Sequence, residues 1–221
     1  MSADAEEILD NLTGDLEPIR ELVSRYDRAR ASSDPGSDVL LLSHRPKIGE
    51  LAYAIEIFPG VSNDSIAAYE KIHKFTVTDF YRDLLMKING ANLFDLSLYG
   101  IPPSMAKDPP LLDRSGRSPL DLATAQEFWI SGFKVAPGAF CFGGAPYSYT
   151  ENVGYFLLPQ TFIQSVRKNG AVVGEWRAFK DFLRDELSRA EAAFPAHEEA
   201  MAAINEEIRK KKTSRKKKRS K

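Results

Sequence analysis

The chain has 221 residues, 43% of them hydrophobic, and its 30 Lys and Arg nearly balance its 31 Asp and Glu. A single cysteine, Cys141, excludes an internal disulfide framework, and the lack of a Cys/His cluster argues against a structural zinc site. The acidic N-terminus and the absence of an apolar run of about 18 residues predict neither a secretory signal nor a membrane span, so we expect a soluble, cytoplasmic protein.

The near-zero net charge hides a division along the chain. Residues 209–221 hold ten of the Lys and Arg and no acid, which leaves 20 basic and 31 acidic side chains in residues 1–208, a net charge of −11. An acidic body with a basic tail bears on partners and solubility rather than on the fold.

The N-terminal third predicts short helices followed by strands. Residues 3–31 are apolar at helical spacing and contain Gly14 and Pro18, so we expect two helices with Pro18 in the first turn of the second. The segment 32–37 has the composition of a linker. Apolar runs at 39–42 and 50–58 suit strands, although periodicity does not separate them from buried helix. Residues 62–74 read as a helix that begins with cap-type residues.

The stretch 76–103 is the piece around which we expect the chain to be arranged. Thr76 caps a predicted helix with Asp79 three residues on, and Asn89–Gly90 ends it. The apolar face of that helix consists of Phe80, Tyr81, Leu84, Leu85 and Ile88. A strand follows, in which Phe94, Leu96 and Leu98 alternate with Asp95, Ser97 and Tyr99. The pattern predicts a helix packed on a sheet, with Leu85 buried.

The next part of the chain predicts a loop, a helix and several strands. Residues 100–118 hold four prolines and suit a surface loop. Ser118 and Pro119 begin a predicted helix over 119–130. Strands are expected at 139–142, 153–158 and 161–166, with tight turns at Gly143–Gly144 and Asn169–Gly170. The fold class is therefore α+β, a mostly antiparallel sheet with flanking helices.

A heptad-like apolar stripe runs from Trp176 to Ile208 at steps of three and four residues. It predicts a C-terminal helix with Trp176 buried, and with a kink or a break at Pro195. The remainder, 209–221, is low in complexity and is expected to be disordered by itself.

Three of these segments together resemble a known family. Residues 85–90 (Leu-x-x-x-Asn-Gly), 98–100 (Leu-Tyr-Gly) and 176–183 (Trp-x-x-Phe-x-x-Phe-Leu) are similar in order and spacing to the SUKH superfamily, the Smi/Knr-like proteins. The resemblance covers roughly residues 61–190, and the chain departs from it at 75–77, Phe-Thr-Val, where the family usually has a Leu-Pro pair. We expect a helical N-terminal extension and linker at 1–37, a SUKH-like domain at 38–193, and a helical extension with a basic tail at 194–221.

Nothing in the sequence predicts catalysis. His44, His73 and His197 are scattered, and no Gly-x-Ser-x-Gly elbow or phosphate-binding glycine loop is present. Cys141 lies between two phenylalanines and suits the core. We therefore expect a non-enzymatic protein without a cofactor or metal.

The resemblance implies protein recognition, because many SUKH members are immunity proteins that neutralise a toxin, often a nuclease, and others are regulatory scaffolds. An acidic body suits a basic toxin domain. The candidate partner-binding residues are Asp95, Tyr99, Tyr147, Tyr149, Glu151 and Asn152, which mix acids with aromatic side chains near predicted turns. A covering role at the edge of their own sheet is the other interpretation of the tyrosines.

The basic tail supports an alternative, a nucleic-acid-associated accessory or scaffold protein. Its candidate polyanion-binding residues are Lys210, Lys211, Lys212, Arg215, Lys216, Lys217, Lys218 and Arg219. Such a run neutralises phosphates without reading sequence, and the same composition serves as a nuclear signal or a solubilising tail.

Overall fold

A computed structural model of the chain describes residues 3–26, 38–102, 117–146, 151–159 and 162–219, with only the backbone at 3–5, 201, 205, 208–209 and 211–219. Within these ranges the fold is α+β, with one eight-stranded sheet whose strands follow one another in chain order. All neighbouring strands are antiparallel. The strands are β1 Leu40–His44, β2 Tyr53–Pro59, β3 Ile88–Leu93, β4 Leu96–Leu98, β5 Phe140–Pro146, β6 Asn152–Leu157, β7 Ile163–Arg167 and β8 Val172–Trp176.

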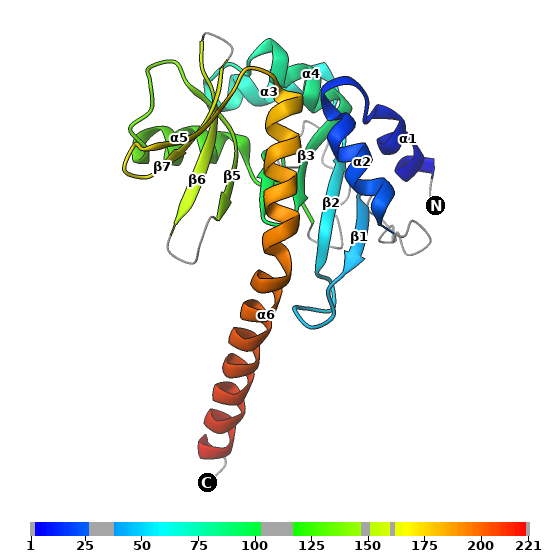
Figure 1. Cartoon of the computed structure of the whole chain (residues 1–221), viewed down its shortest axis with the longest axis vertical. Helices are drawn as coiled ribbons and strands as arrows, with labels where there is room; N and C mark the ends of the chain where they lie inside the picture. The colour runs from blue at the N-terminus through cyan, green and yellow to red at the C-terminus, as the bar shows by residue number, and fades with distance from the viewer. Residues whose placement is uncertain (1–2, 27–37, 103–116, 147–150, 160–161, 220–221) are drawn as a thin grey trace.

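Helices cover both faces of this sheet (Figure 1). They are α1 Ala3–Asn11, the short 3-10 helix η1 Gly14–Leu16, α2 Glu17–Arg25, α3 Asn63–His73, α4 Asp79–Lys87, α5 Leu122–Gly132 and α6 Phe179–Arg219. On β6, the ring of Tyr155 meets Phe182 of α6, whereas the ring of the next residue, Phe156, meets Phe133 at the end of α5. Since successive strand residues face opposite sides, α6 and α5 cover opposite faces of the sheet.

The N-terminal helices are part of the main core. Pro18 lies in the first turn of α2, as expected, because its fixed φ suits that position and its missing N–H has no partner there. The apolar residues of α1 and α2 join the same buried cluster as the sheet. Lys180 at the start of α6 is paired with Glu17, and Arg25 and Glu191 lie 2.5 Å apart, so the two ends of the chain are joined.

The central stretch confirms the helix on a sheet but shifts its limits. Leu85 is buried as predicted, but the capping residue is Thr78 rather than Thr76. Asn89 and Gly90 do not end the helix: α4 ends at Lys87, and both lie within β3. Gly90 has φ +84°, and a Cβ there would be 2.6 Å from the carbonyl oxygen of Leu98. The glycine is therefore required by close strand packing rather than by a helix end.

The predicted single strand after Gly90 is a hairpin. Phe94 and Asp95 separate β3 from β4, and Phe94 has φ +57°. Leu93 pairs with Leu96 across this turn. Apolar and polar residues alternate through the turn as well as in the strands, and the sequence pattern therefore predicted one continuous strand.

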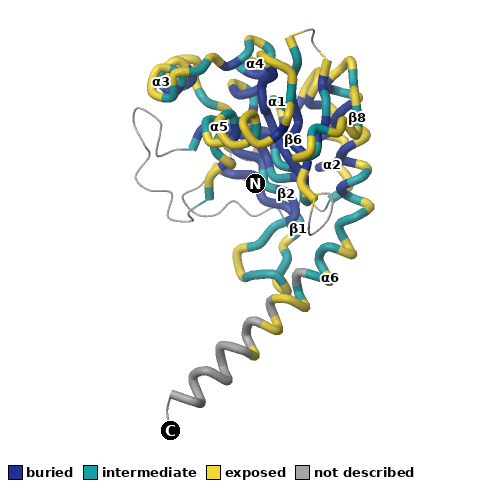
Figure 2. The backbone as a smooth tube through the Cα atoms, turned by 90° about the vertical axis from the view of Figure 1, so that its left-hand side faces the viewer, coloured by how far each residue is buried: buried dark blue, intermediate teal, exposed yellow. Residues whose placement is uncertain are grey.

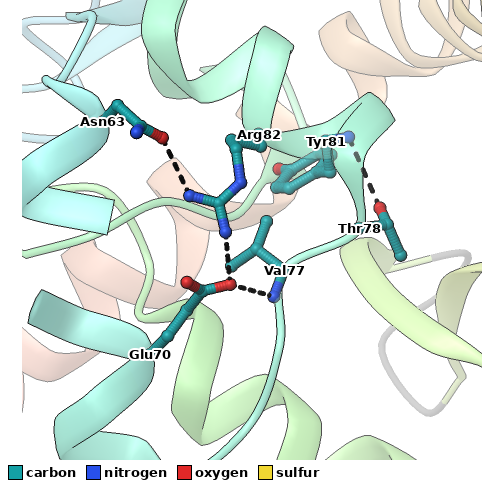
Figure 3. A network of polar contacts seen from close by, with 6 residues as sticks. All are labelled: Asn63, Glu70, Val77, Thr78, Tyr81 and Arg82. Carbon is teal, nitrogen blue, oxygen red and sulfur yellow. Dashed lines mark hydrogen bonds and ion pairs between the residues drawn. The ribbon is translucent and has the colours of Figure 1, made fainter. Parts of the chain in front are cut away.

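Polar contacts fix α3 against α4 (Figure 3). Glu70 accepts hydrogen bonds from Arg82 at 2.6 Å and from the backbone N–H of Val77 at 2.7 Å. Arg82 also donates to the side chain of Asn63 at 2.9 Å. Because the arginine and the carboxylate are both half-buried, this arrangement holds the connection between the helices in one conformation.

Two helix boundaries differ from the prediction. The helix predicted from Ser118 starts at Leu122 with Asp121 as its cap, whose side chain accepts from the N–H groups of Ala123 and Thr124. Trp176 does not begin the last helix but ends β8, a strand that the sequence analysis missed. It is half-buried rather than buried, against Phe182, and its Nε1 donates to Asp185 at 2.9 Å.

Helix α6 is longer and more continuous than predicted. Pro195 lies inside it, so the predicted break is wrong. The boundary drawn at residue 194 falls within this helix, and α6 continues to Arg219, so the predicted disorder of residues 209–219 is also wrong. Lys and Arg are good helix formers, and a helix already nucleated by its packed half is extended at little cost.

Helix α6 carries a buried carboxylate that contacts the sheet. Glu186 is 3% exposed and accepts hydrogen bonds from the hydroxyl of Tyr155 and, at 2.8 Å, from Nε of Arg189. The charge is therefore paired where it is removed from water. Figure 2 shows buried residues concentrated in the body and exposure increasing along α6. Among the described residues, no helix is both long and apolar enough to cross a membrane.

Candidate functional site

An open groove lies between the second half of α5 and the ends of β6 and β7. Its volume is about 650 Å³, and it lies on the face of the sheet opposite α6. The groove is lined by Phe128, Trp129, Ser131, Gly132, Phe133, Glu151, Asn152, Arg167, Lys168 and Asn169. A cavity of this size suits a small ligand or the side chains of a protein partner.

The apolar wall of the groove comes from α5. Phe128 is 68% exposed, the largest exposed fraction among the described large apolar side chains. The neighbouring Trp129 packs instead on the core and on Phe133, with ring centroids 4.5 Å apart. Exposed aromatic side chains at the edge of a cavity are typical anchors of protein interfaces.

A pair of glycines on the sheet seats Trp129. Gly144 of β5 and Gly154 of β6 lie opposite each other. A Cβ on Gly154 would be 2.7 Å from Cε3 of Trp129, and a Cβ on Gly144 would be 3.3 Å from Cζ2 of the same ring and 2.5 Å from the hydroxyl oxygen of Tyr99. The predicted Gly143–Gly144 turn is wrong, because both residues lie inside β5, where missing side chains allow α5 to approach.

The polar wall of the groove carries both signs of charge. Glu151 and Arg167 are 3.5 Å apart, and both are well exposed. Lys168 and Asn169 follow in the β7–β8 turn, and Asn152 begins β6. An exposed ion pair contributes little to stability, about 0 to 1 kcal/mol, so these groups are free to exchange partners when another protein binds.

The predicted partner-binding residues differ in exposure and in position relative to the groove. Glu151 and Asn152 are exposed and line the groove. Tyr99 is only 5% exposed, so the expectation that it is an accessible anchor is wrong. It follows the end of β4, its hydroxyl lies against Gly144 of β5, and burial raises the pKa of that hydroxyl. Tyr147 and Tyr149 lie outside the described residues.

Asp95 is already engaged within the chain. It is half-buried in the β3–β4 turn, and its carboxylate contacts Nδ1 of His197 on α6. The strand register places this turn and Asn152 at the same end of the sheet, since Ser97 pairs with Gly144 and Pro146 pairs with Asn152. Asp95 does not line the groove. The contact that it makes holds α6 on the body.

The predicted polyanion-binding residues all lie on α6. Lys210 is exposed and pairs with Glu206 at 2.6 Å. The backbone of the other seven is helical, and their side chains lie outside the described part of the structure. The arrangement brings these residues together on one element, away from the groove.

Phe128, Trp129 and Arg167 were missed by the sequence analysis. A signal was present in α5, where Leu122, Ala125, Trp129 and Phe133 follow the helical apolar period, whereas Phe128 and Ile130 fall off it. Large apolar side chains off the buried stripe of a helix are candidates for contact with another molecule.

A second polar cluster, at the start of α5, is structural. Desolvation raises the pKa of Asp121, but hydrogen bonds from Thr124, Tyr69 and the backbone together outweigh it and lower the pKa. The oxygen of the Tyr69 hydroxyl also accepts from the N–H of Ala123 at 2.6 Å. These contacts satisfy the first N–H groups of α5, which is the work of a helix cap.

The described residues contain no group of three or more His, Cys, Asp or Glu able to hold a metal ion. Cys141 is buried in β5, and burial raises the pKa of its thiol, so the sulfur is held in its unreactive form. The chemistry offered by the groove is therefore that of recognition: an aromatic contact surface beside exchangeable charges and amides.

Comparisons of the chain with family models, with curated proteins and with solved structures found no match. The resemblance to the SUKH superfamily stays a prediction.

Proposed function

We propose that this chain is a non-catalytic protein-binding domain, an immunity protein that binds and neutralises a toxin in the cytoplasm, and that the groove beside α5 is its contact surface. The observation that carries the proposal is Phe128, which is 68% exposed at the edge of a cavity of about 650 Å³. Leaving a phenylalanine in water forgoes about 1.5 to 3 kcal/mol of burial, which a partner recovers on binding.

The charge distribution supports a basic partner. Residues 1–208 carry a net charge of −11. Complementary charge speeds encounter and suppresses wrong partners, whereas the aromatic anchor determines how long the complex lasts. Nuclease toxins are a suitable class because their active faces must attract phosphates.

The resemblance of residues 85–90, 98–100 and 176–183 to SUKH proteins supports the same role. The α+β fold, with its antiparallel sheet and flanking helices, agrees with what that resemblance implies about architecture.

The experiment captures protein partners on the full chain from nuclease-treated lysate of the source cell and then measures their binding kinetics. Phe128→Ala is expected to raise the dissociation rate by about tenfold or more, the loss of an anchor worth at least 1.4 kcal/mol. Ile130→Ala is the matched control, because Ile130 is exposed on the same helix but does not line the groove.

Glu151→Lys is expected to lower the association rate for a basic partner and to weaken its salt dependence. Glu50→Lys makes the same change of charge in the exposed β1–β2 turn, outside the groove, and should have a smaller effect. The captured protein must also be toxic when produced alone and harmless when produced with the chain. A partner that is not toxic, or that binds the Phe128 and Glu151 variants like the parent, would contradict the proposal and favour a scaffold role.

A further inference from the structure

Helix α6 leaves the body at a defined point. Phe194, His197 and Glu198 contact the body shortly before that point. The ring of Phe194 meets Phe94 at 4.9 Å, and Arg45 lies over the same ring and 3.7 Å from Glu198. Figure 1 shows the rest of α6 projecting well beyond the sheet.

The projecting part of α6 has two sections of opposite charge. Residues 199–208 contain Glu199, Glu206 and Glu207 and no Lys or Arg. Residues 209–219 contain nine Lys and Arg and no acid. At about 1.5 Å per residue, the first section moves the start of the second about 16 Å beyond Glu198, and the second section is itself about 16 Å long.

We propose that the end of α6, residues 209–219, is a binding element for duplex nucleic acid, and that residues 199–208 are a spacer that holds it away from the acidic body. Nine charges along about 16 Å correspond to about one per 1.8 Å, close to the one phosphate per about 1.7 Å of duplex axis. An α-helix also fits the major groove of DNA, which is about 12 Å wide.

The distribution of the charges favours a groove over a flat surface. At about 100° per residue, the nine basic positions fall on all sides of the helix axis. A duplex groove presents phosphates on two sides of an inserted helix, whereas a membrane surface meets only one. The section also contains no apolar residue to enter the lipid interface, which amphipathic membrane helices require.

Electrostatics explains why a spacer between the body and the basic section would favour binding. Residues 1–208 carry a net charge of −11, which repels phosphates and attracts the basic section. At physiological salt the Debye length is about 8 Å, so a separation of about 16 Å reduces both effects strongly. Packing of α6 up to Glu198 keeps the helix directed outward, which a flexible linker would not do.

The decisive experiment shortens the spacer in the full chain. Deleting residues 199–205 removes close to two helical turns, which leaves the basic section facing nearly the same way but about 10 Å nearer the body. We expect binding of a labelled 20-base-pair DNA duplex to weaken about three- to tenfold at about 50 mM salt, and the difference to shrink as salt rises. Because the deletion also removes one acid, Glu199, loss of charge alone would strengthen binding, and Glu199→Gln is the matched control for that effect.

The basic section is tested by its salt dependence. The double variant Lys216→Gln and Lys217→Gln should lower the slope of log affinity against log salt by about 2, equally for unrelated duplex sequences. The proposal would be overturned if the chain without residues 209–221 still bound the duplex. It would also be overturned if the variant with the shortened spacer bound the duplex as tightly as the parent does. Equal binding to vesicles of phosphatidylcholine with about 30% phosphatidylserine would overturn it in favour of a lipid surface.

Discussion

Replacing Gly154 with alanine tests whether the glycine seat of Trp129 positions the groove. The added Cβ would lie 2.7 Å from Cε3 of Trp129 and 2.7 Å from Cε2 of Phe156. Carbon atoms in contact are normally about 3.5 to 4.0 Å apart, so both rings must move by about 1 Å. Overpacking of this kind costs about 1 to 3 kcal/mol, and we expect Gly154→Ala to lower the free energy of unfolding by that amount.

The control is Gly132→Ala, at the end of α5, where an added Cβ meets no atom within 4 Å. Alanine is the better helix former by up to about 1 kcal/mol, so this variant should be unchanged or slightly more stable. Urea unfolding measures both, and fluorescence in a Trp176→Phe background reports Trp129 alone. Equal stability of the two variants, with unchanged Trp129 emission, would show that the glycine pair does not seat this ring.

Three further predictions concern the core and two titrating groups. Leu85→Ala should cost about 2 to 5 kcal/mol in urea unfolding, whereas Met86→Ala, at the next and exposed position, should cost under about 0.5 kcal/mol. Because the pKa of Asp121 is lowered in the folded state, its carboxylate contributes fully to stability above the unfolded-state pKa of about 3.8, and that contribution is lost as pH falls through the lower folded-state pKa. The difference in unfolding free energy between the parent and Asp121→Asn should therefore shrink in acid. A difference that grew in acid would contradict the lowered pKa. Burial, and then the hydrogen bond to Glu191, raise the pKa of Tyr26 to about 12, so its contribution is complete below about pH 10 and is lost as pH rises toward 12. Tyr26→Phe should remove that alkaline loss, and an unchanged alkaline profile would count against it.

The sequence predicted the elements that have a clear period and a clear cap. Ser62 caps α3 by accepting from the N–H of Ser65, and Pro18 begins α2, because both positions depend on neighbouring residues alone. Leu85 was predicted as core from helical spacing and is buried. The antiparallel sheet followed from short strands with turn signals between them, although β8 was missed.

The errors share a physical cause, which is packing between segments distant in sequence. Gly90 and Gly144 read as local turn or stop signals, but each is required by a strand or side chain that approaches from elsewhere. Tyr99 was expected to be exposed because it is near a predicted turn, yet it is buried and its hydroxyl lies against Gly144 of β5. The α5 side of the groove could not be predicted from the sequence for the same reason, since α5 meets β6 and β7 only through tertiary structure.

The pairing of α2 with α6 has a consequence for synthesis on the ribosome. Glu17 and Lys180 are 163 residues apart in sequence, so at about 5 to 20 residues per second the partner of α2 is made about 8 to 33 s after it. Until then the face of α2 that packs on α6 lacks its cover, while successive hairpins of the sheet can already pair with their neighbours. The nascent chain is therefore expected to need chaperone protection chiefly at its N-terminal helices, and early termination before α6 should leave a product that is degraded rather than folded.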